Sequence, residues 1–340
     1  MLITQSISRL RGLRFRAEYL AALLLLRVLA ILPKEVSLMI ASMVAAGAYL
    51  VMSQLRRIAN RNLTFAFPQQ PKKQKLKLIW RVFMNFGRLL VEFSRLPKLN
   101  RENISEVVVY EGFENFSEAL RRGKGTLFLT AHFGAWELCP FAHALYGYPL
   151  KFVVRPIDNP YLDRLVTSYR TMSGNQIIQK RNSLKELLRA LKKRESVGIL
   201  IDQNTTREAG VFVDFFGKPA SAIRGPVTLA LKTDAPIVFS LDVRQPDNRH
   251  HVLILPAIDL AISGNLEQDV QTNTVRILKI LEGYIRQYPG QWLWLHNRWK
   301  TPPDAKWQTK RQIQRRHLKR DLKCYTHRSL EGKSSRRIGR

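Results

Sequence analysis

The sequence predicts one α/β domain with a central, mostly mixed sheet flanked by helices, with apolar membrane-associating helices before it and a basic tail after it. Short apolar runs alternate with amphipathic ones from about residue 75 to residue 300, a pattern typical of strands and helices that share one core. Two longer apolar runs precede this region, and Lys and Arg are frequent in the last residues. We therefore divide the chain into a membrane-associating segment (1–55), an α/β domain (56–305) and a C-terminal tail (306–340).

The N-terminal segment combines basic and apolar stretches. Residues 1–16 contain arginines and no acid, and two apolar runs follow, at 19–32 and 36–53, the first interrupted by Arg27. A membrane-spanning helix needs about 20 apolar residues, so the first run is short and the second only borders this length. Arginines also follow the second run. This pattern predicts a hairpin with both ends in the cytoplasm or helices lying on the membrane; two buried helices of a soluble core are the alternative.

The α/β domain contains no internal repeat and no long linker, so we expect one domain of catalytic size. Its apolar runs are short enough for strands, and the amphipathic runs between them have the length of helices. The expected strands are 106–110, 126–131, 151–155, 197–201, 237–243 and 251–255, and the expected helices are 76–96, 113–122, 136–145, 160–172, 183–193, 226–233 and 266–287.

The charge of the chain calls for an anionic partner. There are 56 Lys and Arg against 26 Asp and Glu, a formal net charge of +30. Nucleic acid, anionic lipid and an acidic protein are the partner classes that such a charge attracts. The basic tail beyond about residue 307 suits a solvated extension that sits on anionic lipid. A nucleic-acid arm is the alternative, although the chain contains no zinc-finger, RNP or helix-turn-helix pattern.

Metal and nucleotide chemistry have no support in the sequence. The two cysteines, Cys139 and Cys324, are too few for a disulfide framework or a thiolate metal site. The histidines outside the motifs described below have no metal-ligand spacing, and no Walker loop, G-x-G-x-x-G or G-x-S-x-G motif is present. We therefore expect no cofactor and no metal.

A histidine and a carboxylate follow the expected strand at 126–131. His132 stands at the strand end, Gly134 permits a tight turn, and Glu137 falls in the first turn of the next helix. A strand end and the helix after it can bring these two side chains together, and a carboxylate beside an imidazole favours its action as a general base. The alternative is a lone histidine in a turn. Asp202 ends the strand 197–201, where an acid either belongs to a site or holds an arginine in place.

These residues belong to a series of motifs in a fixed order along residues 20–300. The motifs are 57–63 before Phe67-Pro68, His132 to Glu137, 154–160, Arg170 to Gly174, Asp202-Gln203-Asn204, 213–217 and 292–300. The ordered set resembles the bacterial lipid A late (lauroyl and myristoyl) acyltransferase family, within the lysophospholipid acyltransferase superfamily. The tail after about residue 305 lies outside the resemblance.

The resemblance implies an enzyme at the cell inner membrane, with its catalytic domain facing the cytoplasm. Its acyl donor would be acyl carrier protein and its acceptor a hydroxyl of a lipid A precursor, without nucleic acid. His132 would act as the general base and Glu137 as the carboxylate that orients it, whereas Arg155 and Arg170 suit phosphates on the acceptor or on the donor's phosphopantetheine arm. Asp202 completes the expected substrate-binding residues.

Other readings stay open at this point. The same chemistry could serve a lysophospholipid or another glycolipid, with acyl-CoA or acyl carrier protein as donor. A protein of another class would be a non-catalytic, basic membrane- or nucleic-acid-binding protein. Residues 212–217 suit either an acyl groove or ordinary core. The alternating tryptophans 292, 294 and 299 suit an interfacial belt or a strand, and we leave them outside the expected site.

Overall fold

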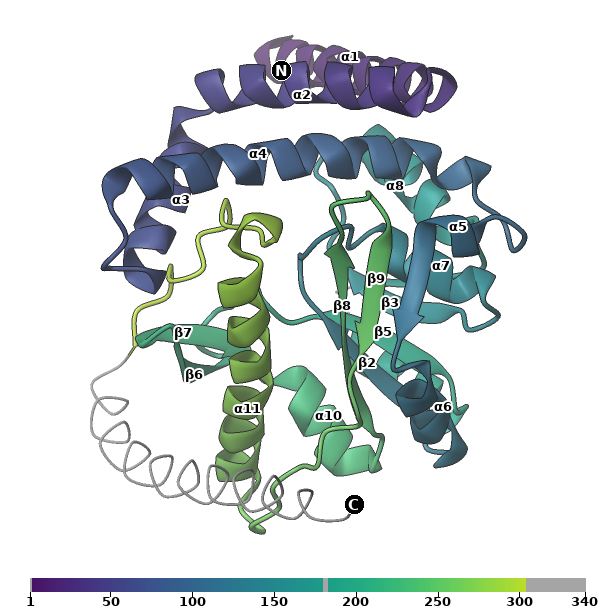
Figure 1. Cartoon of the computed structure of the whole chain (residues 1–340), viewed down its shortest axis with the longest axis vertical. Helices are drawn as coiled ribbons and strands as arrows, with labels where there is room; N and C mark the ends of the chain where they lie inside the picture. The colour runs from purple at the N-terminus through teal and green to yellow at the C-terminus, as the bar shows by residue number, and fades with distance from the viewer. Residues whose placement is uncertain (1, 180–182, 304–340) are drawn as a thin grey trace, which may run out of the picture.

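The computed structural model describes residues 2–179 and 183–303, with side chains from residue 11 onward. A seven-stranded sheet lies at its centre, in the order β1-β9-β8-β2-β5-β3-β4, and helices flank it (Figure 1). Neighbouring strands run parallel except β8 and β9, which are antiparallel. The mixed α/β fold expected from the sequence is therefore confirmed. The strands of this sheet are β1 (Val108–Glu111), β2 (Thr126–Thr130), β3 (Leu150–Val154), β4 (Gln176–Gln179), β5 (Ser196–Leu200), β8 (Ile237–Arg244) and β9 (His250–Ile254).

Helices and a separate hairpin cover the two faces of the sheet. The hairpin consists of β6 (Gly210–Phe215) and β7 (Lys218–Ile223), and it packs against the long helix α11. The helices are α1 (Leu2–Ile31), α2 (Lys34–Val51), α3 (Ser53–Ala66), α4 (Lys72–Arg95), α5 (Ile104–Val107), α6 (Phe113–Arg121), α7 (Leu138–Leu145), α8 (Pro160–Thr171), α9 (Ser183–Lys192), α10 (Gly225–Thr233) and α11 (Leu266–Gln287), with 3₁₀ turns η1 (Leu96–Lys98) and η2 (Pro289–Gln291).

Alternate residues of the central strands feed two separate hydrophobic cores. In β2, Leu127 and Leu129 point to the core beneath α10, α11 and the hairpin, whereas Phe128 points to the core beneath α6 and α7. This two-residue period is the expected consequence of a pleated strand that is buried on both faces. The middle of the sheet, where β2 and β5 pair side by side, is thus buried on both faces.

The elements differ from the expected ones at polar or irregular positions. Residues 104–107 form a helical turn that buries Ile104, so the first strand begins only at Val108. The edge strand β4 and the β6–β7 hairpin were not expected, because their polar residues interrupt any continuous apolar run. The segment 292–299, which suited a strand, contributes only an isolated bridge between Trp292 and Phe133.

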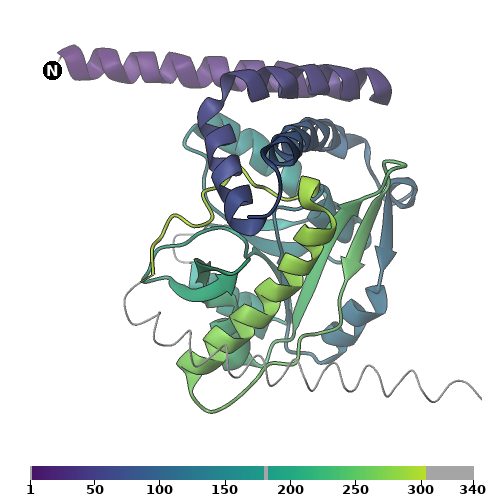
Figure 2. The ribbon, with the colours of Figure 1, turned by 60° about the vertical axis from the view of Figure 1, so that its left-hand side comes forward.

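The two N-terminal helices form an outer layer on the domain. α1 and α2 lie side by side across α4 (Figures 1 and 2). The contact with α4 is close because it uses small residues: a Cβ added to Gly87 of α4 would lie 2.8 Å from the carbonyl oxygen of Ala41 in α2. The side chains that face outward are largely apolar, namely Leu13, Leu20, Leu24 and Ile31 of α1 and Met39, Met43, Val44, Leu50 and Val51 of α2.

By length and composition, α2 could cross a membrane. Only 17% of its apolar window is buried, so α2 is not a core helix of the kind that the soluble alternative required. The expected basic tail, residues 306–340, lies outside the described residues, and the three segment boundaries stay predictions.

Candidate active site

Three expected site residues follow the carboxyl ends of neighbouring parallel strands. His132 comes shortly after β2, Asp202 after β5, and Arg155 directly after β3. In open α/β sheets this edge is where ligands bind, because the loops that leave parallel strands converge there. The sequence expectation that the site lies at strand ends therefore agrees with the fold.

His132 is held by Asp202. The imidazole Nδ1 lies 2.8 Å from Oδ1 of Asp202, and the backbone N–H of His132 donates to Oδ2 at 3.1 Å. Asp202 itself is only 2% exposed. Burial alone would lower the pKa of His132, but the charge and hydrogen bond of Asp202, with a contribution from Glu137, raise it above its ordinary value. Burial likewise opposes ionisation of Asp202, yet His132 and its other donors lower the pKa of this carboxyl.

Glu137 does not bond to His132, contrary to the expectation. Its two carboxylate oxygens accept hydrogen bonds from Nε and Nη2 of Arg170 in α8, the first at 2.8 Å. The turn after His132 directs Glu137 to α8, while the Nδ1 side of the imidazole faces the end of β5. Glu137 acts on His132 through its charge, and it fixes the Arg170 guanidinium in the two-pronged geometry that carboxylates favour.

Gly134 makes this arrangement possible. Its φ is +58°, and a Cβ at this position would lie 2.0 Å from the carbonyl oxygen of Asp242 in β8. Only glycine fits both the left-handed backbone and the close approach. The tight turn expected at this residue is therefore confirmed, and it packs directly on the backbone of β8.

The Nε2 side of His132 faces an open cleft of about 300 Å³. Arg155 and Arg170 both line it, together with Gln203, whose amide nitrogen lies 3.3 Å from Nε2. The Arg155 side chain is 78% exposed and lies 4.0 Å from Asp158, so most of its donors face solvent. The cleft thus combines one imidazole with two guanidinium groups.

An apolar cavity adjoins this cleft beneath α7. The two share Val153, Val154, Arg170, Ile199 and Leu200, so one opens beside the other. The apolar cavity extends along the sheet, and its other lining residues include Phe128, Trp136, Cys139, Leu150, Phe152 and Gly198.

Trp292 is a site residue that sequence reasoning left out. Its indole Nε1 donates to Oδ2 of Asp202 at 2.8 Å, so that His132 and Trp292 hold the carboxylate from two sides. His296 accepts a hydrogen bond from the backbone N–H of Asn204 at 3.0 Å, which anchors the loop after Asp202. The only sequence signal for these residues was their place in the ordered motifs. Phe215 and Phe216, expected in an acyl groove or in the core, are buried against Trp292 and Trp294 and belong to the core.

An imidazole oriented by a buried carboxylate, beside an arginine-lined cleft and an apolar cavity, is typical of an enzyme that uses a general base on a partly fatty substrate. The comparison with known proteins narrows this class. The chain matches the family model for bacterial lipid A biosynthesis acyltransferases over residues 8–301 and belongs to that family.

Individual relatives cover most of the chain. A lipid A biosynthesis lauroyltransferase of Escherichia coli K12 is 29% identical over 255 residues, which are 75% of this chain and 82% of the relative. A lipid A biosynthesis palmitoleoyltransferase of the same organism is 27% identical, over 80% of this chain and 87% of its own. A phosphatidylinositol mannoside acyltransferase of Mycolicibacterium smegmatis is 24% identical, over 70% and 78%.

Proposed function

We propose that the protein transfers a fatty acyl chain from acyl carrier protein to a hydroxyl of a lipid A precursor, with His132 as the general base. The observation that supports this most directly is the orientation of His132, because Asp202 occupies Nδ1 and leaves Nε2 facing the cleft. Membership of the lipid A acyltransferase family supports the reaction class. We therefore infer an O-acyltransferase of the H-x4-E type. In it, Asp202 orients His132, and Glu137 holds Arg170.

In the proposed reaction, Nε2 of His132 takes the proton of the acceptor hydroxyl. The oxygen attacks the thioester carbonyl, the C–S bond breaks, and the departing thiolate receives the proton from His132. The products are an ester and the free thiol of the carrier. Asp202 stabilises the imidazolium that forms between these steps. General-base assistance of this kind contributes roughly 10²- to 10⁴-fold.

The arginines suit the anionic parts of both substrates. Arg155 and Arg170 line the cleft from β3 and α8, and phosphate groups occur on lipid A precursors and on the phosphopantetheine arm of the carrier. Arg170 gives Nε and Nη2 to Glu137, which leaves Nη1 for a ligand. We assign Glu137 the role of positioning Arg170 and of favouring the imidazolium by its negative charge.

The apolar cavity beneath α7, with a volume of about 60 Å³, suits the first carbons of the acyl chain. This cavity meets the cleft at Val153, Val154, Arg170, Ile199 and Leu200, so a thioester carbonyl near His132 can lay its chain against the four apolar residues of this junction. We assign the acyl chain to this cavity and not to residues 212–217, because Phe215 and Phe216 of that segment are buried in the core.

We place the catalytic domain on the cytoplasmic face of the inner membrane. The outward apolar side chains of α1 and α2 form a surface suited to the bilayer. Asn159, at the start of α8, donates to the carbonyl oxygen of Phe15 at 2.8 Å and to Glu18 at 3.0 Å in α1. The helix that carries Arg170 is thereby attached to the helix layer that would contact lipid.

A second candidate function keeps the chemistry and changes the acceptor to another phosphorylated glycolipid. The similarity to a phosphatidylinositol mannoside acyltransferase over 70% of this chain favours it. Acyl-CoA as donor and a lysophospholipid as acceptor belong to the same alternative. A non-catalytic basic binding protein would tolerate the loss of His132.

The test is mass spectrometry of lipids after membranes with the protein are incubated with acyl-carrier-protein thioester and a tetra-acylated lipid A precursor. We expect a species heavier by one acyl chain with wild type and with His251→Ala, a histidine of β9 outside the cleft, and none with His132→Ala. Product from His132→Ala at the wild-type rate would refute the role of His132. No product with any folded variant would refute the substrate pair, and phosphatidylinositol mannoside and acyl-CoA would be offered next.

A further inference from the structure

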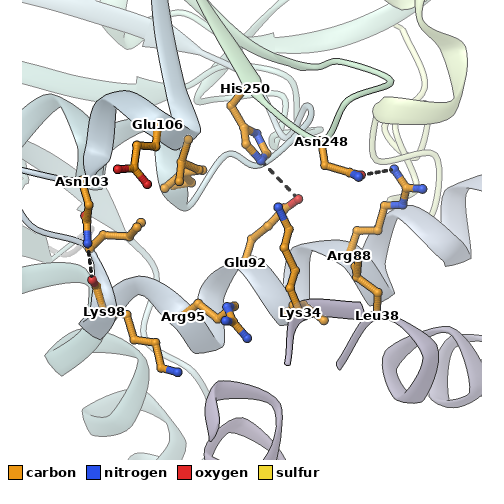
Figure 3. Close-up of a pocket in the computed structure, with 14 residues that line it drawn as sticks. Lys34, Leu38, Arg88, Glu92, Arg95, Lys98, Asn103, Glu106, Asn248 and His250 are labelled. Carbon is orange, nitrogen blue, oxygen red and sulfur yellow. Dashed lines mark hydrogen bonds and ion pairs between the residues drawn. The ribbon is translucent and has the colours of Figure 1, made fainter. Parts of the chain in front are cut away.

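A second cavity of about 270 Å³ lies between the helical layer and the sheet (Figure 3). Its walls come from α2, α4, the segment from Lys98 to Val107, and the turn between β8 and β9. It shares no lining residue with the His132 cleft or with the apolar cavity. Helix α7 separates the two regions, since Glu137 lines the apolar cavity and Leu138 lines this one.

The cavity is lined by an excess of positive charge. Its lining includes four cationic residues, Lys34, Arg88, Arg95 and Lys98, and two carboxylates, Glu92 and Glu106. Glu92 is already neutralised, because it accepts two hydrogen bonds of 2.6 Å from Arg244. His250 carries a positive charge between Glu92 and Asp242, so this inner group of charges balances itself.

The cations of the outer wall have unused hydrogen-bond donors. Among the residues that the structure describes, Lys34 and Lys98 form no ion pair. Arg88 donates one bond to the side chain of Asn248 at 3.3 Å and keeps its other N–H groups. Figure 3 shows Lys34 and Arg88 extending from the helical layer toward the side on which Asn248 and His250 lie. Such unpaired donors suit the oxygens of a phosphate.

Apart from Asn103, the rest of the lining is apolar. Leu38, Val91, Leu99, Val107 and Leu138 complete the walls. Leu38 is followed by Met39, one of the exposed apolar side chains of the outer layer. A ligand with an anionic head and an apolar body matches this order of surfaces, whereas a free phosphate would leave the apolar walls unused.

We propose that this cavity binds the phosphate-bearing headgroup of an anionic membrane lipid, at a site separate from the acyl-transfer cleft. The proposal rests on the membrane placement of α1 and α2 given above, and not on the identity of the acyl donor or acceptor. Lys34 and Arg88 bind the phosphate, and the apolar walls contact the glycerol backbone and the first carbons of the acyl chains.

The test is native mass spectrometry of the detergent-purified full chain, titrated with phosphatidylglycerol or with phosphatidylcholine of the same chains. We compare wild type, Lys34→Gln/Arg88→Gln, and a control pair in α9, Lys185→Gln/Arg189→Gln, which also removes one exposed lysine and one exposed arginine. We expect wild type and control to retain one phosphatidylglycerol in preference to phosphatidylcholine. The Lys34/Arg88 pair should bind it roughly 30-fold more weakly, at about tenfold per 1.4 kcal/mol and ~1 kcal/mol per basic residue.

Several results would overturn the proposal. Equal retention of both lipids by wild type, or unchanged phosphatidylglycerol binding in the folded Lys34/Arg88 variant, would show that the cavity does not select the headgroup. Displacement of the lipid by glycerol 3-phosphate at equal concentration would assign the site to a soluble phosphate ester. Because the assay contains no acyl donor or acceptor, its outcome is independent of the proposed reaction.

Discussion

Asp202 is the residue on which the proposed chemistry depends most. It accepts hydrogen bonds from the ring and backbone of His132 and from Trp292, and it is almost completely buried. Such a carboxylate fixes the imidazole so that Nε2 is the basic nitrogen, and it stabilises the protonated ring. In the proposed mechanism, Asp202 therefore takes the positioning role that the sequence assigned to Glu137.

Replacing Asp202 with asparagine tests this assignment. We expect kcat to fall by about 10³- to 10⁴-fold, because the imidazole loses its orienting charge. Since Asp202 raises the pKa of His132, and only the neutral imidazole accepts a proton, the acid limb of the residual pH–rate profile should move to lower pH. Asp234→Asn, at an exposed turn, is the control. Wild-type activity in Asp202→Asn would contradict the proposed role of Asp202.

Gly198 in β5 tests the apolar cavity as the acyl site. A Cβ at this position would lie 3.4 Å from Cβ of Phe152 and 3.6 Å from Cδ1 of Leu150, inside the cavity wall. Gly198→Val should shorten the preferred acyl chain by at least about two carbons, since each buried methylene contributes ~0.8 kcal/mol. Gly198→Ala, which makes ordinary contacts, should change it less. Competition between acyl-carrier-protein thioesters of different length measures the preference, and an unchanged optimum in the valine variant argues for another acyl site.

The sequence predicts those features of the site that depend on residues close together along the chain. His132, Gly134 and the position of Asp202 at a strand end are local features, and all three could be placed from the sequence. The pairing of His132 with Asp202 joins β2 to β5, and that of Glu137 with Arg170 joins α7 to α8. The sequence favoured Glu137 because it falls in the first turn of the helix after His132, whereas the pairing of β2 with β5 brings Asp202 to the imidazole. Trp292 lies 90 residues from Asp202 and reaches it only in the folded state.

At the scale of elements, a buried group of charges joins α4 to β8 and β9. Arg244 bonds to Glu92 and also to Asn85 of α4, while His250 lies between Glu92 and Asp242. Burial opposes each charge, but the partners lower the pKa of Glu92 to about 2 and raise the pKa of His250 to about 9. This group of charges also contacts the candidate active site, because Gly134, two residues after His132, packs on the carbonyl oxygen of Asp242.

These shifts predict a pH window for stability. The raised pKa of His250 contributes stability that is complete below its unfolded value of 6.5 and is lost as pH rises to about 9. The lowered pKa of Glu92 contributes stability above pH 4.5 that is lost as pH falls toward 2.

Because of His250, the free energy of unfolding should fall by up to about 3 kcal/mol between pH 6.5 and 9, at 1.36 kcal/mol per pKa unit. Urea unfolding at the two pH values measures it. His250→Gln should flatten this dependence and His251→Gln should not; an equally steep dependence in His250→Gln would refute the role of His250.

The elements that the sequence predicts well are those with strong periodicity. The paired central strands β2, β5 and β8 and the long helices α4 and α11 match their expected ranges to within a few residues, because uninterrupted apolar patterns define them. The β6–β7 hairpin has no such pattern, and its stability comes from packing against α11. Tertiary contacts rather than local preference therefore determine that part of the fold.

For the whole molecule, the outer layer of α1 and α2 gives the domain one apolar face. Both helices cross α4 (Figure 2), and their outward residues are exposed. This arrangement favours helices that lie in the membrane surface, while α2 alone also has the length and composition of a span. The net charge of +30 adds attraction to anionic lipid.

Charges placed on this face should release the protein from membranes. We expect Met39→Glu/Met43→Glu to reduce flotation with phosphatidylglycerol vesicles at 0.5 M salt, where screening weakens electrostatic binding. The control is Leu184→Glu/Ile262→Glu, which changes two exposed apolar residues elsewhere on the domain. Equal flotation of both variants and wild type would show that the α2 face does not contact lipid.

The two hydrogen bonds of Asn159 have a consequence for how a lipid is presented to the cleft. Asn159 caps α8 and donates hydrogen bonds to α1. These bonds hold α8 and its Arg170 at a fixed distance from the surface that α1 contacts. With α1 on the bilayer, His132 is set at a constant depth relative to the lipid headgroups. The protein would then select the acceptor hydroxyl by its distance from the membrane plane, because only a hydroxyl at the depth of His132 could react.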